Sequence, residues 1–402
     1  MIRKEDLRSI ILDQRQNLEA ENRFITRNQL NTIDPDSPQA LVITGVRRCG
    51  KTILLKELAQ SLPGYYYLSF EDARLTPFEA TDFIKTEEVF LEEFGKCDYL
   101  LFEEIQNVPG WEFYIRQKLD QKRHVILSGS NARLLSREPG THLTGRHLDF
   151  ELFPFSYQEY LVFKNTTAGL SSFQKYLTLG GFPEFLFSRK KDYLQQLLID
   201  VLMRDIAVKH AVRNVKVLKE MTVFLLSNVG KDYSYHSIRR VFSLGAVTTV
   251  IDYISFLEES YLLFSIPKFD HSLKNQSVNP KKIYAVDNGL ALANSLSFSS
   301  DMGRMLENLV FLMLRRRYKE IYYFRDTREC DFIVRESGVV TMAVQVCAQL
   351  THDNKDRELE GLKNAMLFFN LPEGLLLTMN EDDKITIGDR TITIKPVWKW
   401  NC

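Results

Sequence analysis

The chain has 402 residues, more than one hydrophobic core usually organises, so we expect two to four domains. Hydrophobic residues make up 45% and charged residues 26%, which excludes a largely disordered or collagen-like chain. Lysine and arginine total 52, as do aspartate and glutamate, so no global field draws the protein to nucleic acid or membrane and any polyanion site must be a local patch.

The N-terminal residues lack the uninterrupted apolar run of a secretory signal, because Glu5, Asp6 and Asp13 fall within it. No stretch approaches 18 consecutive apolar residues, the length that a membrane-spanning helix needs. The five cysteines are scattered, with no C-x-x-C pair that would indicate zinc or thiol redox chemistry. These features predict a cytoplasmic protein with no membrane partner and with reduced cysteines.

Short apolar runs alternate with helical patterns over the first third of the chain, which is typical of an α/β domain. We place an N-terminal helical segment at residues 1–35 and a five-stranded parallel sheet of the P-loop type at residues 36–154. The expected strands are residues 41–45, 65–70, 98–105, 124–130 and 147–152.

The rest of the chain divides into three predicted parts. Residues 155–215 read as a helical lid or connector, interrupted at Gly180 to Phe185, where two glycines and a proline require a turn. Residues 216–298 give three helices and then strand-like runs around 275–280, which suggests a winged helix. Residues 299–402 read as a separate α/β domain with the order helix, three strands, helix, strand. Its expected strands are near residues 321–325, 331–335, 341–347 and 374–378.

Residues 45–52 fit the pattern G-x-x-x-x-G-K-[ST] between an expected strand and helix, which predicts a phosphate-binding loop. The glycines let backbone N–H groups surround the phosphates, and the start of the helix adds its positive dipole end. Lys51 can reach the β- and γ-phosphates, and Thr52 can ligate Mg²⁺. The expected loop contacts to the nucleotide are Gly45, Val46, Arg47, Arg48, Cys49, Gly50, Lys51 and Thr52.

An acidic pair ends the apolar run at residues 100–104. We expect Glu103 to hold Mg²⁺ through water and Glu104 to act as the catalytic base that activates the attacking water. Ser130 and Asn131 follow the fourth strand, and their spacing leaves two interpretations open: contact with the γ-phosphate, or a helix-capping turn. Arg146 is likewise either an arginine finger toward a neighbouring subunit or a surface ion pair.

Several segments together resemble bacterial and archaeal ATPases of the AAA superfamily that carry a C-terminal domain of unknown function. The matching segments are GVRRCGKT, LLFEEIQNVPGWE, ILSGSNARLLS, LTGR with ELFPFSYQEYL, GGFPEFL, IYAVDNGL and GRMLENLVFLMLRRR. The resemblance implies that the cofactors are ATP and Mg²⁺, that ATP is hydrolysed to ADP and phosphate, and that a winged helix and a restriction-endonuclease-like domain follow. Glu103 stands where the family usually has aspartate, so we expect slower hydrolysis.

The end domain departs from an active nuclease. Glu307 and Asp331 match two metal-binding positions of the restriction-endonuclease fold, whose site also needs a carboxylate and a lysine on the third strand. Gln345 and Cys347 occupy those two positions, and a neutral thiol cannot replace an ammonium ion. We predict a degenerate nuclease kept for binding or assembly, in which Glu307 and Asp331 are structural polar groups.

The partner stays open between nucleic acid and protein. The third helix of the expected winged helix, residues 246–263, contains no lysine or arginine, which disfavours base reading in a DNA groove. Two basic groups could still grip a phosphate backbone: Lys268, Lys274, Lys281 and Lys282 around the wing, and Lys209, Arg213 and Lys216, spaced to share one helix face.

Three functions therefore remain. The first is an ATPase whose nucleotide state controls the winged-helix and end domains, the second a DNA-processing ATPase, and the third a nucleotide-gated switch acting on protein partners. The sequence predicts no particular oligomeric state.

Overall fold

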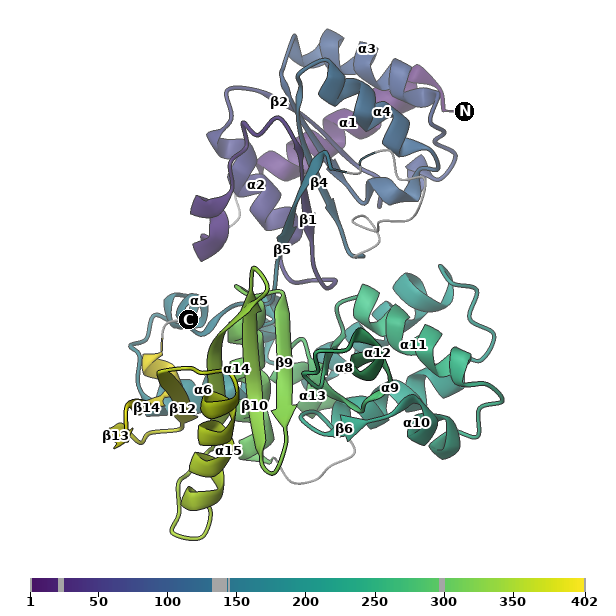
Figure 1. The fold of residues 1–402 in the computed structure, drawn as a ribbon. Coiled ribbons are helices and arrows are strands. Elements are labelled where there is room, and N and C mark those ends of the chain that lie inside the picture. The colour runs from purple at the N-terminus through teal and green to yellow at the C-terminus, as the bar shows by residue number, and fades with distance from the viewer. Residues whose placement is uncertain (1, 21–24, 132–142, 144, 296–300, 401–402) are drawn as a thin grey trace. The chain divides into compact units, whose positions relative to one another are not determined.

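The computed structural model describes residues 2–20, 25–131, 143, 145–295 and 301–400 (Figure 1). The chain divides into two compact units, Met1–Leu152 and Phe153–Cys402. None of the helices formed by the described residues is long and apolar enough to cross a membrane.

A five-stranded, all-parallel sheet forms the centre of the first unit, in the order β2-β3-β4-β1-β5. The predicted α/β sheet is therefore confirmed. All five residues of β1 are buried, as expected for a parallel strand with both faces covered. The strands are β1 (Ala40–Thr44), β2 (Tyr65–Ser69), β3 (Tyr99–Glu103), β4 (His124–Gly129) and β5 (His147–Glu151).

The N-terminal helix α1 (Lys4–Glu19) is part of the core of this unit, because its Leu7 and Ile10 lie in one buried cluster with Val42 and Leu68 of the sheet. Burial of such side chains stabilises the fold by about 1.5–3 kcal/mol each. The other helices are α2 (Lys51–Ser61), α3 (Asp82–Phe94) and α4 (Trp111–Asp120), with 3-10 turns at Asn28–Thr32, Ala73–Leu75 and Ile105–Asn107.

The second unit begins with short helices that end in a π-helix, Val201–Ala207. Ala211 then adopts a left-handed backbone with φ 48°, which an L-residue does not adopt inside a helix, and α9 (Val215–Ser227) begins afterwards. Lys209 and Arg213 lie in this connection, so the predicted basic stripe on one helix face is wrong. The preceding helices are α5 (Tyr157–Lys164), α6 (Leu170–Leu179), α7 (Pro183–Ser188) and α8 (Lys191–Asp200).

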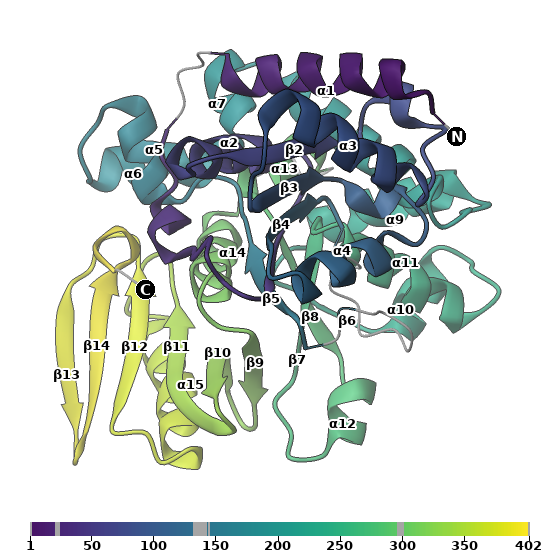
Figure 2. The same cartoon turned by 90° about the horizontal axis from the view of Figure 1, so that it is seen from above.

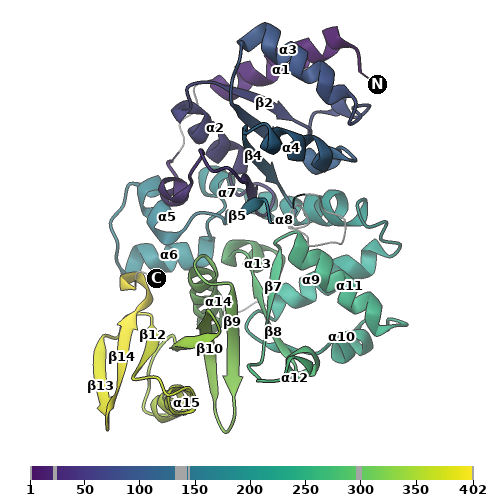
Figure 3. The same cartoon turned by 45° about the horizontal axis from the view of Figure 1, so that its top comes forward.

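A three-stranded antiparallel sheet, β6-β8-β7, follows with α9, α10 and α11 grouped beside it (Figure 3). The expected strands around 275–280 are wrong: this stretch is the short helix α12, and the strands lie on either side of it. The Ser272 hydroxyl accepts the Asn275 N–H and caps that helix. The elements are β6 (Asp232–Tyr233), α10 (Tyr235–Val241), α11 (Val247–Glu259), β7 (Leu263–Pro267), α12 (Leu273–Val278), β8 (Lys281–Ala285) and α13 (Asn288–Asn294).

The last part of the second unit is a six-stranded mixed sheet in the order β13-β14-β12-β11-β10-β9 (Figure 2). Its four predicted strands are confirmed, and a hairpin of two further strands extends one edge. The elements are α14 (Met302–Arg315), β9 (Glu320–Arg325), β10 (Glu329–Glu336), β11 (Val339–Val346), α15 (Lys355–Phe368), β12 (Glu373–Thr378), β13 (Asp383–Ile387), β14 (Arg390–Pro396) and the 3-10 turn Val397–Lys399.

Candidate nucleotide site

The loop between β1 and α2 has a shape that depends on its two glycines. A Cβ on Gly45 would lie 2.1 Å from the carbonyl oxygen of Leu152, far inside van der Waals contact. Gly50 adopts a φ of 106°, and a Cβ there would lie 3.2 Å from the guanidinium of Arg27. The sequence pattern therefore reflects a backbone conformation that other residues cannot adopt without strain.

Lys51 is the first residue of α2 and its side chain is buried. Its ammonium group donates to the carbonyl oxygens of Gly45, at 2.9 Å, and Val46, at 3.2 Å. Both of these hydrogen-bond partners are neutral backbone groups. An anion entering the loop can therefore replace these partners with charged oxygen atoms.

The Thr52 hydroxyl and the Glu103 carboxylate lie together at the end of the sheet. Thr52 Oγ1 donates to Glu103 Oε1 at 2.8 Å, and the Tyr67 hydroxyl donates to Glu103 Oε2. Burial raises the pKa of Glu103, and the hydrogen bonds from Tyr67 and Thr52 oppose that rise. A hydroxyl and a carboxylate oxygen at this separation fit a hard divalent cation, which prefers oxygen ligands.

Glu104 leaves the line of β3 because its backbone is left-handed, with φ 50° and ψ 37°. Residues other than glycine adopt this conformation rarely and at a cost of about 1–3 kcal/mol, and such residues cluster at functional sites. Because β4 lies between β1 and β3, Ser130 reaches the same place, and its hydroxyl donates to Glu104 Oε2 at 3.2 Å. Asn131 is buried beside it, whereas the helix predicted after Asn131 lies outside the described residues.

The three arginines predicted to contact a nucleotide lie in different parts of the first unit. Arg47 pairs with Glu71 at 2.7 Å, and Arg48 holds a left-handed turn of the loop with φ 66°. Arg146 pairs with Asp120, and its side chain is 46% exposed. Its carbonyl accepts from the first residue of β1, so Arg146 lies at the amino edge of the sheet, opposite the phosphate loop of its own chain.

Two residues of this site carry no signal in the sequence. The Arg27 guanidinium is fully buried and donates to the Cys49 carbonyl of the loop at 2.9 Å. Tyr67 meets Glu103 because β2 pairs with β3, with Tyr67 opposite Leu101. Neither residue belongs to a motif, and the strand register that brings Tyr67 to the site is not visible in one sequence.

The protein-family model described as "AAA domain" matches residues 37–161, and one described as "Domain of unknown function (DUF8612)" matches residues 170–301. The solved structure of Cdc6p from Pyrobaculum aerophilum is similar with a TM-score of 0.30 and 13% identity, over 74% of this chain and 98% of that chain.

Two relatives match most of the chain. One is an uncharacterized protein of Haemophilus influenzae, 28% identical over 79% of this chain and 84% of its own length. The other is the uncharacterized protein MJ1544 of Methanocaldococcus jannaschii, 32% identical over 394 residues, or 90% of this chain and 87% of that protein. The chain, with its phosphate loop inside an AAA domain, therefore belongs to the same family as MJ1544.

Proposed function

We propose that the protein is a Mg²⁺-dependent ATPase that hydrolyses ATP to ADP and phosphate. The observation that carries this proposal is the 2.8 Å contact between Thr52 and Glu103, which joins the phosphate loop to the acidic end of β3. Mg²⁺ held there would neutralise charge on the transferring phosphoryl group. Lys51 would exchange its two carbonyl partners for the β- and γ-phosphates.

Glu104 is the proposed catalytic base. Its carboxylate would take a proton from the attacking water, and the Ser130 hydroxyl holds the carboxylate in place. Ser130 and Asn131 would then respond to the presence of the γ-phosphate. Arg146, at the opposite edge of the sheet, would act only on the nucleotide of a neighbouring subunit, and would first have to release Asp120.

The element order of the second unit supports the finer domain assignment. The order α9-β6-α10-α11-β7-β8, with the short α12 inserted between β7 and β8, supports a winged helix, proposed for residues 216–298 after the connector at 155–215. The order α14-β9-β10-β11-α15-β12 is that of a restriction-endonuclease-like core, proposed for residues 299–402. Burial raises the pKa of Cys347 to about 11, so its thiol is neutral at pH 7, which supports a degenerate nuclease.

A protein partner is supported better than DNA. The third helix of the winged-helix part, α11, contains no lysine or arginine. Lys282, predicted to grip a phosphate backbone from the wing, is only 3% exposed, so that prediction is wrong. Of the wing lysines, Lys281 donates to the Tyr235 hydroxyl at 2.8 Å. We propose that the nucleotide state of the ATPase governs binding of a protein to the second unit.

The test is nucleotide binding and steady-state ATP turnover, with and without Mg²⁺, in four proteins. We expect Mg²⁺-dependent turnover in the wild type, loss of nucleotide binding in Lys51→Ala, and binding without turnover in Glu104→Gln. The matched control is Lys96→Ala, which removes an exposed lysine of the same unit and should change nothing. Equal turnover in the wild type and Glu104→Gln would contradict the assigned base.

A second arm of the experiment distinguishes the partners. Turnover is measured with single-stranded and double-stranded DNA at two salt concentrations, because phosphate contacts weaken steeply with salt. We expect turnover that does not respond to DNA. Stimulation that fades at high salt would instead identify a DNA-processing ATPase.

A further inference from the structure

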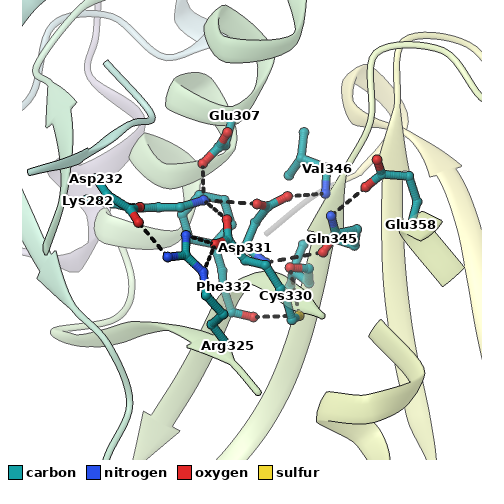
Figure 4. Close-up of polar contacts among 12 residues, drawn as sticks. Asp232, Lys282, Glu307, Arg325, Cys330, Asp331, Phe332, Gln345, Val346 and Glu358 are labelled. Atoms are coloured by element: carbon teal, nitrogen blue, oxygen red, sulfur yellow. Dashed lines mark hydrogen bonds and ion pairs between the residues drawn. The ribbon is translucent and has the colours of Figure 1, made fainter. Parts of the chain in front are cut away.

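A buried lysine lies at the centre of a carboxylate cluster in the second unit. Lys282, on β8, is 3% exposed. Its ammonium nitrogen lies 2.7 Å from Glu329 Oε1, 3.0 Å from Glu307 Oε1 and 3.1 Å from Asp331 Oδ1. Figure 4 shows Glu307, from α14, and Asp331, from β10, directed toward this nitrogen. One ammonium group therefore joins three acidic side chains from two elements.

The carboxylates of the cluster also have other partners. The Tyr284 hydroxyl donates to Glu307 Oε1 at 2.7 Å, and the Val346 N–H donates to Asp331 Oδ2 at 3.0 Å. Arg325 pairs with the second oxygen of Glu329 and, at 2.6 Å, with Asp232 of β6. The cluster is a closed network in which each acidic group is held by cations or hydrogen-bond donors.

The two cations of the cluster, Lys282 and Arg325, face four carboxyl groups. Burial by itself would lower the pKa of Lys282, but the surrounding Tyr284, Asp331, Glu307 and Glu329 raise it well above its ordinary value, so the lysine is protonated. Burial raises the pKa of Asp331 to about 7; Lys282 lowers it and Glu307 raises it. The surrounding carboxylates therefore keep Lys282 charged despite its burial.

The position of this ammonium group is informative. In the proposed restriction-endonuclease-like core, Glu307 and Asp331 would match two metal-binding positions, and they line a cavity of about 560 Å³ together with Gln345 and Cys347. An atom within 3.1 Å of all three carboxylates lies where a cation bound by them would lie. With Lys282 in place, no group of three or more His, Cys, Asp or Glu residues within the described ranges is arranged to hold a metal ion.

We propose that the Lys282 ammonium group takes the place of a divalent metal ion in the end domain and fixes β8 to α14 and β10. This inference does not depend on ATP hydrolysis. An ammonium ion can neutralise carboxylates but cannot polarise a water molecule into a nucleophile as a metal does. The end domain therefore keeps a cation among these carboxylates without the chemistry of a metal centre, and Lys282 joins the two sheets of the second unit.

The first test uses Lys282→Met, which keeps much of the length of the side chain and removes its charge. We expect a Tm lower by roughly 5–10 °C, because a buried charge network loses its central partner. Mn²⁺, used as the probe without nucleotide, should restore part of the lost Tm by binding the three carboxylates that have lost the ammonium group. The restoration should disappear when Asp331→Asn is added. The matched control is Lys281→Met on the same strand, with no Mn²⁺ effect expected.

The second test needs no variant of Lys282. Mn²⁺ binding to the nucleotide-free wild type is measured by electron paramagnetic resonance, with Glu103→Gln identifying any ion at the nucleotide site. We expect no Mn²⁺ site that depends on Asp331. A wild-type site that is lost in Asp331→Asn would overturn the proposal, because Lys282 would then lie beside a metal ion. A folded Lys282→Met protein indifferent to Mn²⁺ would overturn it as well.

Discussion

The molecule contains two buried lysines in opposite electrostatic situations. Lys51, in the first unit, donates to two neutral backbone carbonyls of the phosphate loop. Lys282, in the second unit, lies within 3.1 Å of three carboxylates. Both side chains are less than a tenth exposed, so burial alone does not distinguish them.

The charge of the partner groups distinguishes a ligand-binding lysine from a structural one. A buried ammonium ion whose hydrogen bonds go to neutral carbonyls gains charged hydrogen-bond acceptors when an anionic ligand binds, which strengthens those bonds. A buried ammonium ion among carboxylates is already compensated, and removing it leaves unpaired charges inside the protein. Loss of Lys51 should therefore affect ligand binding, and loss of Lys282 should affect folding.

The largest expected effect is on the stability of the second unit. Lys282→Met should lower the free energy of unfolding by about 3–5 kcal/mol, as other buried ion pairs do when one partner is removed. In the double variant with Asp331→Asn, the loss should be smaller than the sum of the two single losses by at least about 1 kcal/mol. Urea unfolding of the four proteins measures this coupling. Additive losses would contradict the assigned role of Lys282, since its contribution to stability would then not depend on Asp331.

Lys51→Met should weaken ATP binding at least about 100-fold, or roughly 2.7 kcal/mol, because the ammonium group has no substitute in the loop. The free energy of unfolding should change by less than about 1 kcal/mol, since the direct hydrogen-bond partners of Lys51 are neutral carbonyls. Isothermal titration with ATP and urea unfolding test the two parts separately, with Lys96→Met as control. A large loss of stability would show that Lys51 is structural, like Lys282.

Asp287 extends the comparison to a buried acid. Its carboxylate accepts the N–H groups of Gly181, at 2.6 Å, and Leu290, at 2.8 Å, and burial raises its pKa to about 6. Because the folded state holds this proton more tightly than the unfolded state, the stabilisation is present at low pH and is lost as the pH rises through 6. The stability of the wild type relative to Asp287→Asn should fall by roughly 2 kcal/mol between pH 4.5 and 7.

Urea unfolding at four pH values measures this difference. Parallel stability curves for the wild type and Asp287→Asn would mean that Asp287 is ionised throughout, with its charge held by the backbone donors.

Tyr67→Phe should have the smallest effect. The phenol hydroxyl fixes the second oxygen of Glu103, so its removal should weaken the apparent Mg²⁺ affinity in ATP turnover about fivefold, or roughly 1 kcal/mol. The ATP-bound kcat at saturating Mg²⁺ should stay within about twofold. A fall in kcat that Mg²⁺ does not restore would show that Tyr67 does more than orient Glu103.

Local patterns were sufficient for the motif residues of the first unit. Lys51 and Thr52 begin α2 after the loop that follows β1, and Glu103 and Glu104 lie at the end of β3. The ends of parallel strands meet at one edge of the sheet. Their proximity therefore needs only the strand assignment and the strand order. The loop glycines also indicate the site in the sequence, because few other residues can adopt their backbone conformation.

The second unit was predicted less well because its central contacts are between distant elements. Lys282 lies 25 residues from Glu307 and 49 from Asp331, and only the packing of β8 against α14 and β10 brings them together. From the sequence, Lys282 resembles its neighbour Lys281 in a basic wing. The predicted stripe through Lys209 failed for a related reason, since one left-handed residue ended the helical spacing that it assumed.

The paired lysines at the start of β8 have a consequence for how the chain finds its correct alignment. If β8 shifted its register by one residue, Lys281 would take the place of Lys282. A lysine would then face the carboxylates in either register, so the ammonium group alone does not distinguish the two. Tyr284 does distinguish the two registers, because it shares the inward face with Lys282 and donates to the same oxygen of Glu307. A slipped strand would present Ile283 there, with no donor. The hydrogen bond of the Tyr284 phenol thus favours the native register of β8 over one shifted by a residue.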